Sequence, residues 1–293
     1  MGLIDYFLKA RDRDVLDSAR LAERIAVPSQ CFDFEALHTH TEAPWEVGGA
    51  ITPEQPLGNE NGPITVAEAA QHLMILGACA AAAMPGDGKR ACFIPVHAVW
   101  GASYQPRALR CVSTLAVQAR ARAWNAGRWQ KNVEAKTELL SGDEVIGTLS
   151  IKYQLFAERT FRQVFSRQHF TQPNAMELPL RVVFAGHHEL VACSPQAYAG
   201  RQVNYSMWSV ALILYGLNQA IARLLDHELD GQVRYSVQYA DIQAVRLVPA
   251  NEQLFFFANL LSLADEDGVC DFSCSATHNT GVVAILRVVV QIH

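Results

Sequence analysis

Two long segments of the sequence consist almost entirely of apolar residues with helical spacing, at 64–83 and at 207–229. A helix that is apolar on most of its faces has to be enclosed by other elements, because water would otherwise contact its side chains. Two short strand-like stretches precede each segment, and four longer ones follow it. The sequence therefore predicts a unit that occurs twice, in which an antiparallel sheet curls around a central helix.

The repeated order of elements divides the chain into three parts. Residues 1–28 have apolar residues at helical spacing with charges between them, which predicts a helical extension that covers the core or contacts a second copy. The first repeat is predicted at 29–171 and the second at 172–293. The stretch QPNAMELP at 172–179 is the predicted connection between the two repeats.

The composition excludes several classes of protein. Half of the 293 residues are hydrophobic, which is enough for a large buried core. The formal charge is −5 and no stretch is rich in Lys or Arg, so nucleic acid is not an expected partner. No apolar run of about 18 residues lacks a charge, so we predict no membrane-spanning helix. The seven cysteines form no CxxC pair and indicate reduced thiols in a cytoplasmic protein.

The first apolar helix contains a carboxylate and an imidazole one turn apart, Glu68 and His72. Residues four apart lie on the same face of a helix. A carboxylate in an apolar pocket has a raised pKa, which suits it to proton transfer near neutral pH. These residues are therefore candidates for general acid and base. The alternative is that both lie at an exposed edge and only hydrogen-bond each other or a strand.

The sequence NENGPITVAE leads into this helix and has the features of an anion-binding helix start. The first amide N–H groups of a helix have no partner within it, and the macrodipole adds positive potential there. Gly62 permits close approach of the backbone, and Thr65 offers a hydroxyl group for capping or for a substrate. Such an end can stabilise negative charge that develops on a carbonyl oxygen.

The layout of residues 29–293 resembles the hotdog fold, in which a curved antiparallel sheet wraps a central helix. Two copies in one chain resemble a double hotdog, an α+β arrangement that many acyl-thioester enzymes use. The resemblance implies a substrate carried on the phosphopantetheine of an acyl carrier protein or of CoA, with no metal and no other cofactor. It leaves a homodimer open.

In the second repeat, AYAGRQVNYSMWSVALILYGLNQA resembles the segment before the central helix of FabA/FabZ-type 3-hydroxyacyl-ACP dehydratases. Gly200 matches the glycine of that family, and Arg201 stands where its catalytic histidine would be. Tyr205 fits the position before the first proline. Arg201 keeps its proton near pH 7, so it cannot act as a general base, but it can hold a phosphate or a carboxylate.

The same segment also resembles FcoT-like acyl thioesterases, in which a tyrosine precedes the helix and an Asn-Gln pair lies within it. The corresponding residues are Tyr198 and Asn218 with Gln219. An alternative for Asn218 is a purely structural hydrogen-bonding role, because a buried amide needs partners.

The remaining histidines give further candidates. His97 lies in FIPVHAVW, a strand that should border the first helix, so its imidazole could approach the thioester. His187 and His188, in AGHHEL, are predicted in a solvated hairpin turn. His38 and His40 have the alternate spacing of one strand face, but no third ligand is evident, so no metal site is predicted.

Three functions are compatible with these patterns. The leading hypothesis is a 3-hydroxyacyl-thioester dehydratase or hydratase of fatty-acid or polyketide-type metabolism, in which Glu68 with His72 or His97 supplies the base and the acid. The close alternative is a hotdog thioesterase in which Glu68 activates water. The third is a non-catalytic acyl-binding or partner subunit.

Overall fold

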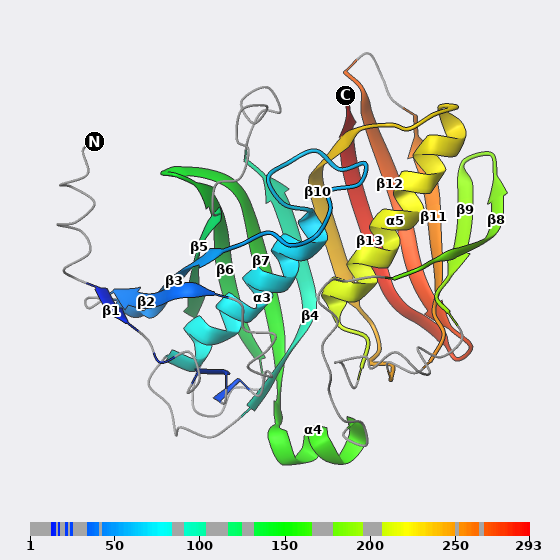
Figure 1. The fold of residues 1–293 in the computed structure, drawn as a ribbon. Helices are drawn as coiled ribbons and strands as arrows, with labels where there is room; N and C mark the ends of the chain where they lie inside the picture. Colours follow the sequence, from blue (N-terminus) through cyan, green and yellow to red (C-terminus); the bar gives the residue numbers. More distant parts are fainter. Residues whose placement is uncertain are drawn as a thin grey trace.

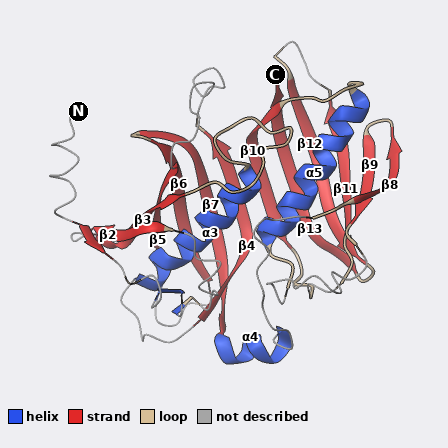
Figure 2. Ribbon diagram, viewed as in Figure 1, coloured by secondary structure: helices blue, strands red, loops and turns tan. Residues whose placement is uncertain are grey.

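The computed structural model describes a single large sheet with two helices packed on one side of it (Figures 1 and 2). The described residues are 13–15, 17, 21–22, 24–25, 34–40, 43–83, 91–103, 117–124, 132–165, 178–195, 207–249, 252–263 and 267–293. Within them the strands are β1 (Arg13–Val15), β2 (Glu35–His40), β3 (Ala43–Ile51), β4 (Ala91–Ala102), β5 (Val117–Trp124), β6 (Asn132–Ser141), β7 (Glu144–Ala157), β8 (Arg181–Gly186), β9 (Glu189–Cys193), β10 (Tyr235–Ala244), β11 (Phe255–Ser262), β12 (Val269–His278) and β13 (Gly281–Ile292). The helices are α3 (Val66–Ala83), α4 (Glu158–Phe165) and α5 (Val210–Glu228).

Apart from β1 at one edge, the strand order in the sheet is symmetric about its centre. It runs β1-β2-β3-β5-β6-β7-β4-β10-β13-β12-β11-β9-β8, and the paired strands are antiparallel. Strands β2, β3 and β4–β7 of the first half correspond to β8, β9 and β10–β13 of the second. The halves meet where β4 pairs with β10, which are equivalent strands. The predicted repeat of two strands, one helix and four strands is therefore confirmed.

Each central helix packs against the strands of its own half, and both are largely buried. By length and composition α3 is apolar enough to cross a membrane, but 83% of it is buried in the fold, as in the core helix of a globular protein. The helices begin and end within three residues of the predicted 64–83 and 207–229. Residues along a strand alternate between buried and exposed when only one face of the sheet is covered. In β5 every second residue is exposed.

Glycine lets α3 approach the sheet closely. A Cβ at Gly77 would lie 2.5 Å from Oη of Tyr153 and 3.1 Å from Cβ of Ala135. The Tyr153 hydroxyl donates a hydrogen bond of 2.6 Å to the carbonyl of Met74 on the same helix. In α5, Gly216 has the same role, because a Cβ there would lie 2.6 Å from the ring of Phe256.

Two parts of the chain differ from the prediction. Within the predicted helical extension at 1–28, Arg13–Val15 forms a strand that pairs with β2, and helical hydrogen bonds link Asp17, Leu21 and Ile25. A three-residue strand gains its stability from the neighbouring strand, which helical spacing cannot reveal. The short helix α4, after β7, was also not predicted; its residues lie within the predicted first repeat, ahead of the connection at 172–179.

Candidate functional site

The start of α3 is held by side chains from the loop before it. The hydroxyl of Thr65 accepts a hydrogen bond of 3.2 Å from the amide N–H of Glu68, which makes Thr65 the N-cap of the helix. The carboxyl group of Glu60 accepts a hydrogen bond of 2.7 Å from the N–H of Val66. Both interactions satisfy first-turn amides that have no partner inside the helix.

The side chain of Glu68 points away from the sheet. Gly77, which contacts the sheet, follows nine residues later, about two and a half turns along the helix, and so lies on the opposite face. Oε1 of Glu68 accepts hydrogen bonds from the backbone N–H groups of Glu54 and Gln55, at 2.7 and 3.2 Å. These residues follow β3, so the loop after β3 covers this face of the helix.

The second oxygen of Glu68, Oε2, is fully enclosed and accepts no hydrogen bond from the part of the chain that the structure describes. Only 2% of the Glu68 residue surface is exposed. Burial raises the pKa of this carboxyl group, although the two backbone N–H groups partly oppose the shift. The predicted carboxylate in an apolar environment is thus present, and the exposed-edge alternative does not describe it.

Glu60 is a second buried carboxyl group at the same helix end, and the sequence analysis did not single it out. Its pKa is raised to about 8, mainly by burial; the Val66 N–H opposes this shift, and the nearby charge of Glu68 adds to it. The sequence does contain a signal for this residue: an acidic side chain shortly before a helix start is stabilised by the positive end of the macrodipole. Two carboxyl groups with raised pKa values therefore share the mouth of α3.

His72 lies one turn further along the helix, as predicted, and is 6% exposed. Its ring contacts that of Phe34 edge to face, with centroids 5.8 Å apart. The spacing of four residues places His72 on the helix face that carries Glu68. The structure thus brings two of the three predicted catalytic residues to one buried face.

The role of the helix start in binding an oxyanion stays a prediction, and two of its amides already have partners. The amides of Val66 and Glu68 are already engaged by Glu60 and Thr65. Gly62 lies in the bend before the helix. Thr65 caps the helix, which was one of its two predicted roles.

His97 is not part of this cluster. On β4, the neighbouring Ala98 and Trp100 face the core, so strand alternation places His97 on the outer face of the sheet. There its Nε2 lies 2.8 Å from Oδ1 of Asp241 on β10. The strand of His97 does border α3, as predicted, but a bulge between Pro95 and His97 shifts its register and turns the imidazole away from the helix.

The start of α5 repeats the capping of α3 with one difference. Ser209 accepts a hydrogen bond of 3.1 Å from the N–H of Leu212, three residues on, as Thr65 does from Glu68. The position of Glu68 in the first repeat is therefore occupied by a leucine in the second.

The other residues predicted for the second repeat lie before α5 or within it. Tyr198, Arg201 and Tyr205 lie outside the described residues. Asn218 is buried on α5, and its Nδ2 donates no hydrogen bond to the residues that the structure describes.

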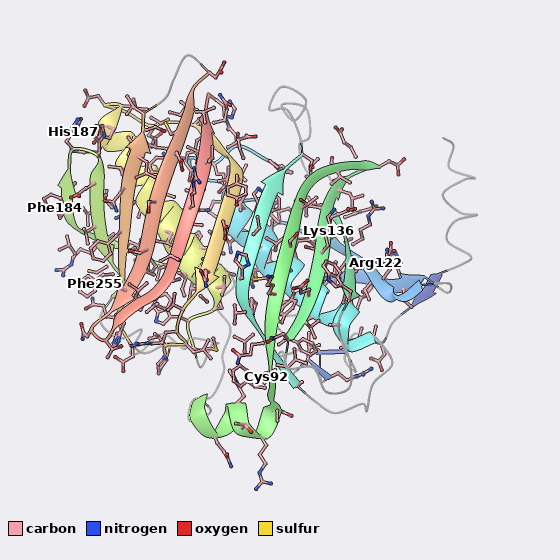
Figure 3. All side chains as sticks on the ribbon, turned by 180° about the vertical axis from the view of Figure 1, so that it is seen from behind. Cys92, Arg122, Lys136, Phe184, His187 and Phe255 are labelled. Atoms are coloured by element: carbon pink, nitrogen blue, oxygen red, sulfur yellow. The ribbon has the colours of Figure 1, made fainter. Side chains whose placement is uncertain are left out.

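A hollow lies on the outer face of β3, β5 and β6, on the other side of the sheet from Glu68. Arg120 and Glu138 form an ion pair there, and Trp124 donates to Glu134. Figure 3, seen from behind, shows Arg122 and Lys136 on this face. Exposed pairs of this kind contribute little stability, and the hollow is separate from the buried carboxyl groups. Its lining residues are Glu46, Arg120, Ala121, Arg122, Trp124, Lys136 and Glu138.

These features define the fold as a double hotdog of the α+β class, and comparisons with solved structures agree. The TesB protein of Mycobacterium avium subspecies paratuberculosis superposes with a TM-score of 0.57 at 13% identity, over 85% of this chain and 94% of that one. A hotdog-fold protein of unknown function from Alicyclobacillus acidocaldarius gives 0.53 at 10% identity, over 95% and 99%. An acyl-ACP thioesterase from Bacteroides thetaiotaomicron gives 0.52 at 14% identity, over 84% and 98%.

At these identities the similarity establishes a shared fold. No protein-family model matches the chain, and no curated protein sequence matches it.

Proposed function

We propose that this protein hydrolyses acyl thioesters carried on CoA or on an acyl carrier protein, with Glu68 as the general base that activates water. One observation carries the proposal: the carboxyl group of Glu68 is buried, oriented by two backbone N–H groups, and has a second oxygen that accepts no hydrogen bond from the described residues. A buried acceptor without a hydrogen-bond partner costs free energy. A water molecule that donates a hydrogen bond to Oε2 would remove that cost.

The reaction needs one proton acceptor and no cofactor. Glu68 takes a proton from water as the water oxygen bonds to the thioester carbonyl carbon, and the carbonyl electron pair moves onto its oxygen. When that pair returns, the C–S bond breaks. Glu68 returns its proton to the sulfur, so the carrier leaves as a thiol and the acyl chain leaves as a carboxylic acid. Because the pKa of Glu68 is raised, the active carboxylate form accumulates as pH rises.

The dehydratase hypothesis has less support than the thioesterase alternative. A dehydratase needs both a base and an acid beside the substrate. His97 is held by Asp241 on the outer face of the sheet, which leaves His72 as the partner for Glu68. Among the solved structures that share the fold, two are named ACP thioesterases. We therefore place hydrolysis first.

A kinetic assay of matched variants tests the proposal. The purified protein is incubated with saturated acyl-CoA substrates of increasing chain length, and the released thiol is measured. Glu68→Gln keeps the shape of the side chain but cannot accept the proton, so turnover should fall by about 10²-fold or more. The control is Glu144→Gln, which changes an exposed carboxylate at the start of β7 and should leave turnover nearly unchanged.

The same incubation with 3-hydroxyacyl and enoyl thioesters separates the alternatives. Loss or gain of water without thiol release would establish the dehydratase instead. Equal turnover in the Glu68→Gln and unaltered proteins would remove Glu68 from the mechanism. Binding of acyl thioesters without either reaction would identify an acyl-binding subunit.

A further inference from the structure

A second cluster of titratable side chains lies at the far end of the sheet from α3. His187 and His188 are the two central residues of the turn between β8 and β9, and Glu228 is the last residue of α5. Figure 3 shows His187 at the tip of this hairpin. Nδ1 of His187 lies 3.2 Å from Oε2 of Glu228, and Nδ1 of His188 lies 3.4 Å from the same oxygen.

These separations match the ligand shell of a small cation. Zn²⁺ binds imidazole nitrogen and carboxylate oxygen at about 2.0–2.2 Å, so neighbouring ligand atoms of a tetrahedral site lie about 3.3 Å apart. Ligand atoms of His187, His188 and Glu228 all lie within 4.8 Å of one another. Two imidazoles and one carboxylate are a ligand set that suits zinc and its neighbours in the first transition series.

The cluster is also built rigidly. The side chain of Glu228 is only 5% exposed, and its Oε1 accepts a hydrogen bond of 2.5 Å from the backbone N–H of His188. That bond fixes the carboxylate and leaves Oε2 directed at the two imidazoles. The Nδ1 atom of His188 is itself enclosed.

Two features of this arrangement have an energetic cost. Glu228 places a negative charge at the C-terminal end of α5, where the macrodipole favours positive charge. His188 has a φ of +62°, a conformation that costs a residue with a side chain and that glycine adopts freely. Strain of this kind persists at sites that the surrounding structure has a reason to hold.

We propose that His187, His188 and Glu228 form a binding site for a divalent transition-metal ion of the zinc class. The ion joins the β8–β9 hairpin, which ends the sheet, to the end of the second central helix. Three protein ligands leave a fourth position for water. Sequence reasoning placed the histidines in a solvated turn and missed Glu228, which is 40 residues from His188 in the chain.

The test is metal binding by the full-length, untagged protein after its metal has been removed with a chelator. Titration with Zn²⁺ in a calorimeter should show one ion bound per chain, and the melting temperature should rise with added Zn²⁺. His187→Ala removes a ligand whose side chain is 80% exposed, so this variant should fold and should bind Zn²⁺ at least tenfold more weakly. His188→Gly removes a ligand from a turn position that suits glycine and should weaken binding equally.

The matched control is His278→Ala. His278 also faces a carboxylate, with its Nε2 at 3.2 Å from Oε2 of Glu252, but that pair has no second imidazole. This variant should bind Zn²⁺ as the unaltered protein does. Substitution with Co²⁺ should give the visible absorption of a tetrahedral site with nitrogen and oxygen ligands. A cobalt–thiolate band, equal Zn²⁺ affinity in His187→Ala, or no binding by the unaltered protein would each overturn the proposal.

Discussion

Glu60 links the protonation of a single residue to the stability of the whole chain. Its pKa is about 8 in the folded protein against 4.5 in its ordinary state, so the folded protein holds this proton more tightly. The free energy of unfolding should therefore fall as pH rises from about 5 to 8, by on the order of a few kcal/mol. Urea denaturation across this range should show a shallower decline for Glu60→Gln, which imitates the protonated group. Parallel curves for both proteins would contradict the assignment.

At the same scale, sequence reasoning found the residues whose position follows from helical spacing and missed those set by tertiary contacts. Glu68 and His72 could be placed on one face because they belong to the same helix. Glu60 was missed although it stands shortly before a helix start, because nothing in a loop sequence shows that its side chain will be buried. The imidazole of His97 was expected to approach the substrate because its strand borders α3, but a one-residue bulge in a strand exchanges its two faces.

The close approach of each central helix to its sheet depends on one glycine. Gly77→Ala would press a methyl group against the Tyr153 hydroxyl and disturb its hydrogen bond to Met74. Gly216→Ala would do the same to the ring of Phe256. Each variant should lose about 1–3 kcal/mol of unfolding free energy in chemical denaturation. Gly231→Ala, where a Cβ meets nothing within 4 Å, is the control and should unfold at nearly the denaturant concentration of the unaltered protein.

The helices could be predicted more fully than any other element. Long apolar segments leave little choice of structure, and both ends of α3 and α5 were placed within three residues. Short elements were not predictable in this way. β1 exists because β2 offers it hydrogen bonds, and α4 spans only 8 residues, too short a stretch for helical spacing to identify it.

The two repeats are joined by side-chain contacts as well as by the pairing of β4 with β10. Oδ1 of Asp226, near the end of α5, accepts hydrogen bonds of 2.9 Å from the side chain of Asn59 and from the backbone N–H of Val233. Asn59 belongs to the loop before α3, so this carboxylate connects the halves. Asp226→Ala should cost about 1.5–3 kcal/mol of unfolding free energy, as the loss of hydrogen bonds to a charged group predicts.

The His97–Asp241 pair provides the comparison, because it also crosses between the repeats but is partly exposed to water. Asp241→Ala should therefore cost less than about 1 kcal/mol. Equal losses in the two variants, measured by the same denaturation experiment, would show that Asp226 has no special part in joining the repeats.

The capping residues of the two central helices have a consequence for how many substrates one chain can turn over at once. In a dimer of identical subunits, any substitution appears in both copies, so both helix starts keep or lose the carboxyl group together. Here the copies are fused, and the third residue after the cap is Glu68 in one half and Leu212 in the other. If Glu68 is the base, a stoichiometric inhibitor should inactivate the protein at one equivalent per polypeptide. The second half, which lacks the carboxylate, is then under no selection for catalysis. It can evolve instead to bind the carrier, CoA or an acyl carrier protein.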